Sequence, residues 1–244
     1  MRAGGSAVGL SPAHERALPP ATNWGAPVGR AITLAFAVGT LVLIAYAMWR
    51  LPPVVWPLLL ANVLYEGLAA GFAVVQTRAT AHASSAPEVI LPVVCTWLYP
   101  LVALAVGDHM ARHGLGVLVV AVVLLLAYGW LIWAILVLRR NFSILPEVRA
   151  LVTGGPYRWV RHPLYLGYAV TWLAGAWQSG SPLLMAVAVL SIVLFDRRAA
   201  MEERRLSAFV PAYAAYMART WRMIPGTGRR RARPLARADA PRAT

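Results

Sequence analysis

The chain has 244 residues, of which 59% are apolar and only 13% charged, and its mean hydropathy is +0.61. A soluble domain of this size needs more polar surface than this composition offers, so a soluble globular protein is excluded and a polytopic membrane protein is indicated. The net charge is +14, and every basic residue is an arginine.

Residues 1–30 are rich in Gly, Ala and Pro and hold no apolar core of a cleavable signal peptide. We expect a disordered cytoplasmic leader here. The first apolar segment then acts as the targeting signal.

Four long apolar segments follow, at 31–49, 51–77, 89–107 and 115–138, and the second contains Glu66 as its one charged residue. Each is close to or above the roughly 20 residues that a helix needs to cross a bilayer. We therefore predict four transmembrane helices between residues 31 and 138.

A fifth apolar block, 164–195, is broken at 178–182 by the sequence QSGSP. Each half would form a helix only about 20 Å long, whereas the hydrocarbon core is about 30 Å thick. Gly180 and Pro182 signal a turn, and arginines flank both ends of the block. We predict a helical hairpin that enters and leaves the membrane on the cytoplasmic side. The alternative, one long tilted helix, would leave backbone groups unsatisfied in lipid at the break.

The arginines are distributed asymmetrically about the predicted spans. With a cytoplasmic N-terminus, all of them except Arg50 and Arg112 lie on the cytoplasmic side, as the positive-inside rule requires. We expect an integral membrane protein with both termini in the cytoplasm, in a bacterial inner membrane, whose arginines attract anionic lipid headgroups. Nucleic-acid binding is not expected, because no aromatic platform accompanies the arginines.

The segment between the fourth span and the hairpin ends in GPYRWVRHP. Gly154, Gly155 and Pro156 break the chain, and Pro156 suits the first position of a short helix. Arg158, Arg161 and His162 would share one face of that helix. Pro163 then begins the hairpin, so this polar cluster lies at the hairpin's mouth.

Residues 196–225 predict an amphipathic cytoplasmic helix. Its apolar stripe follows helical 3–4 spacing and consists of Leu206, Phe209, Tyr213, Tyr216 and Thr220. Pro211 should kink or split the helix. Residues 226–244 read as a basic disordered tail. The predicted fold class is all-α throughout.

Two polar clusters converge at the mouth of this hairpin. They are Tyr157, Arg158, Arg161, His162 and Tyr165 before it, and Arg197, Arg198, Glu202 and Glu203 after it. Taken singly, each arginine also fits a lipid phosphate or a surface ion pair. Together they predict a polar pocket backed by apolar walls. A metal site is not predicted, since the chain has a single cysteine.

Two motifs carry a resemblance to a known family. The first, GPYxxxRHPxYxG, is met at Gly155, Pro156, Tyr157, Arg161, His162, Pro163, Tyr165 and Gly167. The second, EExxL…F…YxxY, is met at Glu202, Glu203, Leu206, Phe209, Tyr213 and Tyr216. Residues 139–225 therefore resemble the isoprenylcysteine carboxyl methyltransferase family, whose wider kin include membrane phospholipid methyltransferases. Residues 1–80 take no part in the resemblance.

The resemblance implies an integral-membrane methyltransferase core at 139–225 that uses S-adenosylmethionine. The residues implied to bind the cofactor are Tyr157, His162, Pro163, Tyr165, Gly167, Glu202 and Glu203. One of the two glutamates would accept hydrogen bonds from the methionyl ammonium. Arg198 would orient the acceptor carboxylate, and Arg161 would complete the catalytic site.

The predicted acceptor is a lipophilic or lipidated molecule methylated on a carboxylate oxygen. An amine acceptor would need a base, and the one spare carboxylate near the cluster, Asp196, has Arg197 beside it to occupy it. Two alternatives remain open at this point: N- or O-methylation of a phospholipid or another lipid, and a non-catalytic membrane binding or assembly protein on the same scaffold. The oligomeric state is not predicted.

Overall fold

The computed structural model describes residues 25–50, 56–77, 79, 86–106 and 115–227. The helices in chain order are α2 (Gly25–Arg50), α3 (Trp56–Val74), α4 (Ala86–Val106), α5 (Leu115–Leu138), η2 (Arg139–Asn141), η3 (Gly155–Arg158), α6 (Pro163–Ser179), α7 (Pro182–Phe209) and α8 (Tyr213–Arg219). Across these residues the structure has no strand, so the all-α prediction is confirmed.

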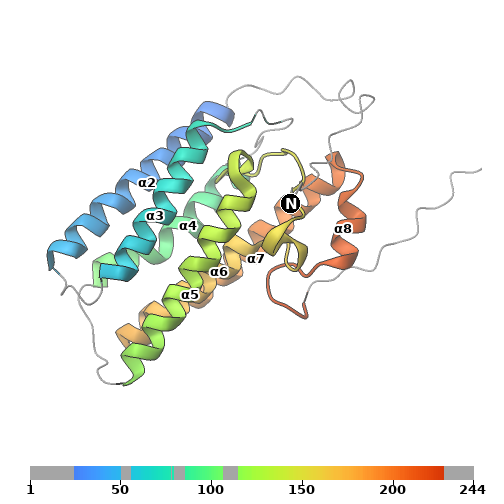
Figure 1. Ribbon diagram of the computed structural model, residues 1–244. Coiled ribbons are helices and arrows are strands. Elements are labelled where there is room, and N and C mark those ends of the chain that lie inside the picture. The colour runs from blue at the N-terminus through green and yellow to red at the C-terminus, as the bar shows by residue number, and fades with distance from the viewer. Residues whose placement is uncertain (1–24, 51–55, 78, 80–85, 107–114, 228–244) are drawn as a thin grey trace, which may run out of the picture.

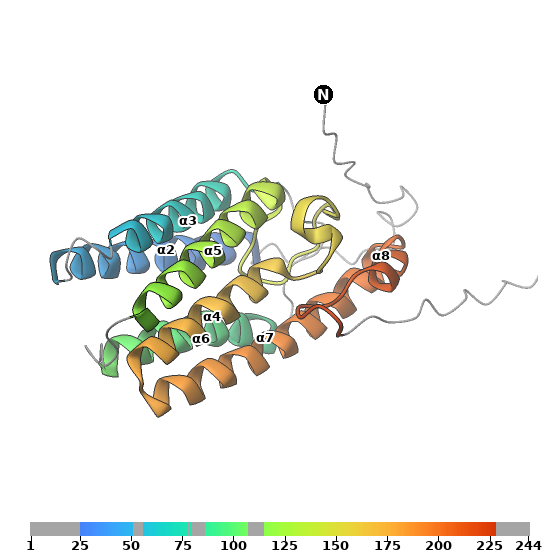
Figure 2. The same cartoon turned by 60° about the horizontal axis from the view of Figure 1, so that its bottom comes forward.

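Helices α2 to α7 lie side by side as an elongated bundle, with α8 beyond one end of it (Figures 1 and 2). Helix α3 packs against α2 and α5, α6 packs against α5 and α7, and α4 packs against α7. Many large apolar side chains point outward from the bundle, among them Val42, Leu118 and Leu126. Such a surface suits lipid rather than water.

Three of these helices are long and apolar enough to cross a membrane: α3, α4 and the segment Gly116–Asn141. The protein is therefore a multi-pass membrane protein. The apolar part of α2, Arg30–Tyr46, is shorter, so the total of four spans stays a prediction. Helix α2 begins at Gly25, inside the segment expected to be leader. The rest of that leader (1–24) and the tail from residue 228 lie outside the described residues.

The predicted turn in the fifth apolar block is present. Gly180 takes the left-handed conformation (φ 67°) that favours glycine, and the Ser181 side chain caps α7 by accepting from the Leu184 amide at 3.3 Å. Figures 1 and 2 place this turn at the same end of the bundle as the start of α5. How deeply the hairpin enters the bilayer stays a prediction.

The second leg of the hairpin is longer than expected. Helix α7 continues unbroken to Phe209, so Glu202 and Glu203 lie on this leg and not on a separate helix. The predicted amphipathic helix is divided between the end of α7 and the short α8, and the predicted split at Pro211 is present. The break falls at Val210–Ala212, where Pro211 lacks the amide that a continuous helix would use.

The apolar stripe continues across this break. Val210, Tyr213 and Tyr216 form a small buried core with Val148 and Leu151 from the loop before η3. This second core attaches α8 and the loop to the end of the bundle, where the polar residues gather.

Gly167 allows α5 and α6 to approach closely. A Cβ atom built there would lie 2.5 Å from Leu131 Cδ2 and 2.6 Å from its Cγ. We expect Gly167→Val to destabilise the protein by about 1–3 kcal/mol through overpacking. Thermal unfolding in detergent measures this loss. Leu131→Ala in the same chain should recover part of it, and an unchanged melting temperature in the single variant would contradict the packing role.

Candidate functional site

The backbone leading into α6 is extended and pairs with a segment after α8. The Trp221 amide donates to the Trp159 carbonyl at 3.0 Å, and the Arg161 amide donates to the Trp221 carbonyl at 2.8 Å. The His162 amide likewise donates to the Arg222 carbonyl at 3.0 Å. This pairing, an isolated parallel bridge centred on Val160 and Trp221, fixes the backbone of the RHP motif.

The prediction that Arg158 shares a helical face with Arg161 and His162 is wrong. The short helix η3 is a 3-10 helix that ends at Arg158, because bonds to the distant segment replace helical bonds in the residues that follow. The Arg158 guanidinium instead lies over the Trp159 ring, 4.1 Å from its centroid, on the exposed side of the loop.

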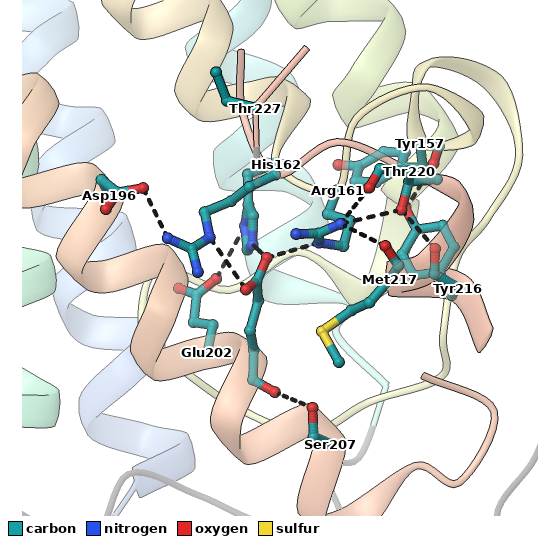
Figure 3. A network of polar contacts seen from close by, with 12 residues as sticks. Tyr157, Arg161, His162, Asp196, Glu202, Ser207, Tyr216, Met217, Thr220 and Thr227 are labelled. Carbon is teal, nitrogen blue, oxygen red and sulfur yellow. Dashed lines mark hydrogen bonds and ion pairs between the residues drawn. The ribbon is translucent and has the colours of Figure 1, made fainter. Parts of the chain in front are cut away.

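Arg161 is a buried connector between three elements. Its Nε donates to Glu203 Oε1 of α7 at 2.7 Å, and its Nη1 donates to the backbone carbonyls of Met217 (3.1 Å) and Thr220 beyond α8 (Figure 3). Its side chain is fully shielded from solvent. This geometry stabilises the site, and the catalytic role of Arg161 stays a prediction.

Two arginines and a histidine surround Glu203. Besides Arg161, Arg222 donates from Nε to Glu203 Oε2 at 3.1 Å, and His162 Nε2 lies 3.5 Å from Oε1. Burial alone would raise the pKa of Glu203, but His162 and the hydrogen-bonded Arg161 outweigh it and hold the pKa at about 2. Glu203 is therefore an anion in the folded protein, with both carboxylate oxygens already in use.

Glu202 differs from its neighbour, because it borders a cavity. Its Oε1 accepts from Tyr165 Oη at 2.5 Å and from Arg198 Nε at 2.9 Å, while Oε2 lies 3.6 Å from His162 Nδ1. Its side chain is 19% exposed, against 4% for Glu203. Oε2 is the carboxylate oxygen that is left for a ligand.

Arg198 is held in place by the loop and by α4. Its Nη2 donates to the Ile144 carbonyl, and its Nη1 donates to Thr96 Oγ1 at 3.3 Å. The guanidinium also lies 5.0 Å from the centroid of the Tyr165 ring. Arg198 thus sits where the cavity meets the apolar bundle.

The cavity is bounded by the loop 141–152, the start of α6, the second half of α7, and α8. Of the predicted site residues, those that line it are Tyr157, Arg161, His162, Pro163, Tyr165, Arg198 and Glu202. His162 and Tyr165 stack, with ring centroids 5.1 Å apart and planes at 8°. The structure therefore brings together residues that lie about forty positions apart in the sequence.

Several buried polar atoms around this cavity lack a hydrogen-bond partner among the described residues. Among them are Ser143 Oγ, Arg149 Nε, Tyr157 Oη and Tyr213 Oη, and all four residues line the cavity. Buried polar groups are normally satisfied, and a cluster of exceptions calls for an explanation. A polar ligand in the cavity would supply the missing partners.

Gly167 and Arg197 also lie apart from the cavity. Gly167 lines an apolar groove between α5 and α6 that includes Trp130, so its contact with a cofactor stays a prediction. Arg197 is exposed. The expected pairing of Arg197 with Asp196 is not what the structure shows, since Asp196 Oδ1 accepts from Arg222 Nη1 at 3.0 Å.

Sequence reasoning missed the loop 141–152 and Arg222. The loop contributes an unbroken run of residues to the cavity wall, although it carries no motif from which that role could be read. One signal was available: Glu147 and Arg149 are two opposite charges within a short apolar stretch. No group of three His, Cys, Asp or Glu side chains is placed to hold a metal ion in the part of the chain that the structure describes.

A known protein family and a solved structure resemble this chain. Residues 118–208 match the model of the isoprenylcysteine carboxyl methyltransferase (ICMT) family. The ICMT resemblance is confirmed. The match runs from α5 through the RHP motif and both legs of the hairpin to Ala208, and it supports a membrane methyltransferase of the isoprenylcysteine type.

A solved structure also shares the ICMT-like fold. The chain is similar to a eukaryotic intramembrane Ras methyltransferase ICMT (isoprenylcysteine carboxyl methyltransferase) solved without a monobody, at 24% sequence identity. The likeness covers 80% of this chain and 75% of that one, with a TM-score of 0.50. At 24% identity, this similarity is evidence for the fold alone. No curated protein sequence matches the chain significantly.

Proposed function

We propose that the protein is an integral-membrane methyltransferase that uses S-adenosylmethionine to methylate a carboxylate oxygen of a lipophilic acceptor. The observation that carries this proposal is the cavity itself, which Glu202 lines together with Ser143, Arg149, Tyr157 and Tyr213, residues that each hold a buried polar atom without a hydrogen-bond partner among the described residues. The ICMT-family match of residues 118–208 gives the reaction class.

The residues around the cavity fit the cofactor chemically. S-adenosylmethionine carries an ammonium, a carboxylate, ribose hydroxyls and an aromatic base. A carboxylate pairs with an ammonium, phenol and serine hydroxyls can bond ribose or carboxylate, and stacked rings offer a face to the base. When bound, the cofactor supplies a methyl group activated on a positively charged sulfur.

The two adjacent glutamates have separate roles in this proposal. Glu203 is enclosed by Arg161 and Arg222 and does not line the cavity. Glu202 does line it, and its Oε2 is left for the methionyl ammonium. We therefore assign cofactor binding to Glu202 and the anchoring of the RHP motif to Glu203.

We assign to Arg198 the binding of the acceptor's carboxylate. This arginine borders the same cavity, is buried, and is oriented by Glu202 and Thr96. A buried arginine of fixed geometry suits a carboxylate that must be held while it reacts. Asp196, the nearby acid that could take a proton from an amine, is already bonded to Arg222. This pairing favours an acceptor that is anionic before it binds.

The position of the cavity suits methyl transfer between a polar donor and an apolar acceptor. Excluding water from a charged nucleophile and aligning the reacting atoms both lower the barrier, and alignment alone can contribute several kcal/mol. The walls help to exclude water, because Leu164, Tyr165 and Tyr168 present apolar surface next to the polar residues. A lipophilic acceptor can approach from the bilayer while the cofactor comes from water.

Methyl transfer with labelled cofactor tests the proposal. Purified protein in nanodiscs is given S-adenosylmethionine labelled in its methyl group, together with either a prenylated cysteine analogue or phosphatidylethanolamine. We expect label in the cysteine analogue, released as methanol by alkali, because a methyl ester hydrolyses and a methylated amine does not. Alkali-stable label in the phospholipid would establish N-methylation instead, and label in neither acceptor would remove the proposed substrate class.

A further inference from the structure

The loop that walls the cavity is fastened to the end of α3. This loop runs from Phe142 to Gly154 and contains no regular helix or strand, yet residues 141–152 form one wall of the cavity. Something outside the loop must hold it, since an irregular segment has few internal bonds to fix its shape. One attachment is the small apolar core with α8 described above.

A second attachment is a buried polar cluster of Gln76, Glu147 and Arg149. Gln76 Nε2 donates to the Phe142 carbonyl at 2.8 Å, and Arg149 Nη2 donates to Gln76 Oε1 at 3.0 Å and to Glu147 Oε2 at 2.6 Å. Gln76 is only 7% exposed, and the side chains of Arg149 and Glu147 are 4% and 1% exposed.

Neighbouring residues extend the same attachment. The Thr77 amide donates to the Arg140 carbonyl at 2.9 Å, and Thr77 Oγ1 lies 3.0 Å from Asn141 Oδ1. Arg140 Nε donates back to the Val75 carbonyl at 2.6 Å. The residues that follow α3 and the start of the loop are thus joined by several bonds in both directions.

Because its members are buried, this cluster favours the one arrangement in which they are paired. Burying an arginine, a glutamate and an amide together is costly unless they bond one another, because leaving one of them unpaired incurs its full desolvation cost. A shift of the loop away from Gln76 would leave Arg149 and the Phe142 carbonyl short of a partner. The loop is therefore held in the position that shapes the cavity.

We propose that Gln76, with Glu147 and Arg149, is a positioning cluster that sets the shape of the cavity wall and thereby the affinity for the cofactor. Gln76 lies outside the segment that matches the ICMT family, residues 118–208. The N-terminal helices would then contribute to the site through this contact. The affinity part of the proposal rests on the proposed function, whereas the positioning part does not.

Hydrogen exchange followed by mass spectrometry tests the positioning directly. In purified Gln76→Leu protein, amides of residues 141–151 should exchange about tenfold faster than in the wild type, since two buried hydrogen bonds are lost. Peptides from α5 and α6 should be unchanged. Gln178→Leu serves as the control. It is the same substitution near the C-terminal end of α6, and it should leave amide exchange in residues 141–151 unchanged.

Thr77→Val covers the case in which Gln76→Leu does not fold. This nearly isosteric change removes the Oγ1 contacts and should accelerate exchange in the same peptides, by about fivefold. If neither variant accelerates exchange in 141–151, or if the Gln178 control does so equally, the positioning cluster is refuted.

Calorimetric titration with S-adenosylhomocysteine tests the affinity part. We expect Gln76→Leu to bind about tenfold more weakly than the wild type, at an unchanged stoichiometry. Equal affinity in a variant whose loop exchanges faster would overturn the link between the cluster and the cofactor. A wild type that does not bind at all would instead refute the proposed function, and the exchange result would still stand.

Discussion

Replacing Glu203 with alanine is expected to unfold the end of the bundle that carries the cavity. The change removes the carboxylate that Arg161 and Arg222 both contact, at 2.7 and 3.1 Å. Since the Arg161 side chain is fully shielded from water, its charge would remain buried without compensation. Removal of one partner of a buried ion pair costs about 3–5 kcal/mol, a large fraction of the stability of an ordinary domain.

Thermal unfolding of the purified protein measures this loss. Arg204→Ala is the matched control, because Arg204 is the next residue on α7 and is exposed, so that it should cost less than about 0.5 kcal/mol. A Glu203→Ala protein as stable as this control would show that the buried pair does not hold the site together.

The same carboxylate sets an expected pH dependence. The pKa of Glu203 is held at about 2, below its ordinary value of 4.5. Its contribution to stability is therefore complete above about pH 4.5 and is lost as the pH falls toward 2. Unfolding curves recorded across this range should show a loss in the wild type that Glu203→Gln lacks. Equal acid sensitivity in both proteins would contradict this assignment.

Replacing Glu202 with glutamine should remove cofactor binding while the fold is kept. Glutamine has nearly the same shape, and its carbonyl oxygen can still accept from Tyr165 and Arg198. It lacks the negative charge that we assign to the methionyl ammonium. A hydrogen bond to a charged group contributes about 1.5–3 kcal/mol, so S-adenosylhomocysteine should bind at least about tenfold more weakly.

Glu88→Gln is the control for this variant. Glu88 also pairs with an arginine, Arg205, at 2.7 Å, and its side chain is 18% exposed, which matches the 19% of Glu202. It does not line the cavity. We expect its titration curve to match that of the wild type. If both variants bind alike, Glu202 does not hold the cofactor.

The sequence allowed the hairpin and its polar mouth to be predicted because those features depend on local rules. Long apolar runs require helices in lipid, and the Gly180–Pro182 break forces a turn that brings the two ends of the block together. That turn brings His162 and Glu202 close together, and the structure places His162 Nδ1 3.6 Å from Glu202 Oε2.

The parts that were not predicted depend on contacts between distant segments. Arg161 and His162 do not continue the helix η3, because their amides bond to the backbone at residues 221–222. Arg222 reaches Asp196 and Glu203 for the same reason. The cavity wall depends on Gln76, more than sixty positions before the loop that it bonds. Periodicity and local turn signals carry no information about such pairings.

In our proposal, this cavity holds S-adenosylmethionine with its ammonium at Glu202. A structure of the protein in nanodiscs, determined by electron cryomicroscopy with S-adenosylhomocysteine added, tests it most directly. We predict ligand density between the loop 141–151 and α7, with the amino group within hydrogen-bond distance of Glu202 Oε2. Ligand density elsewhere on the protein, or an amino group bound away from Glu202, would contradict the account.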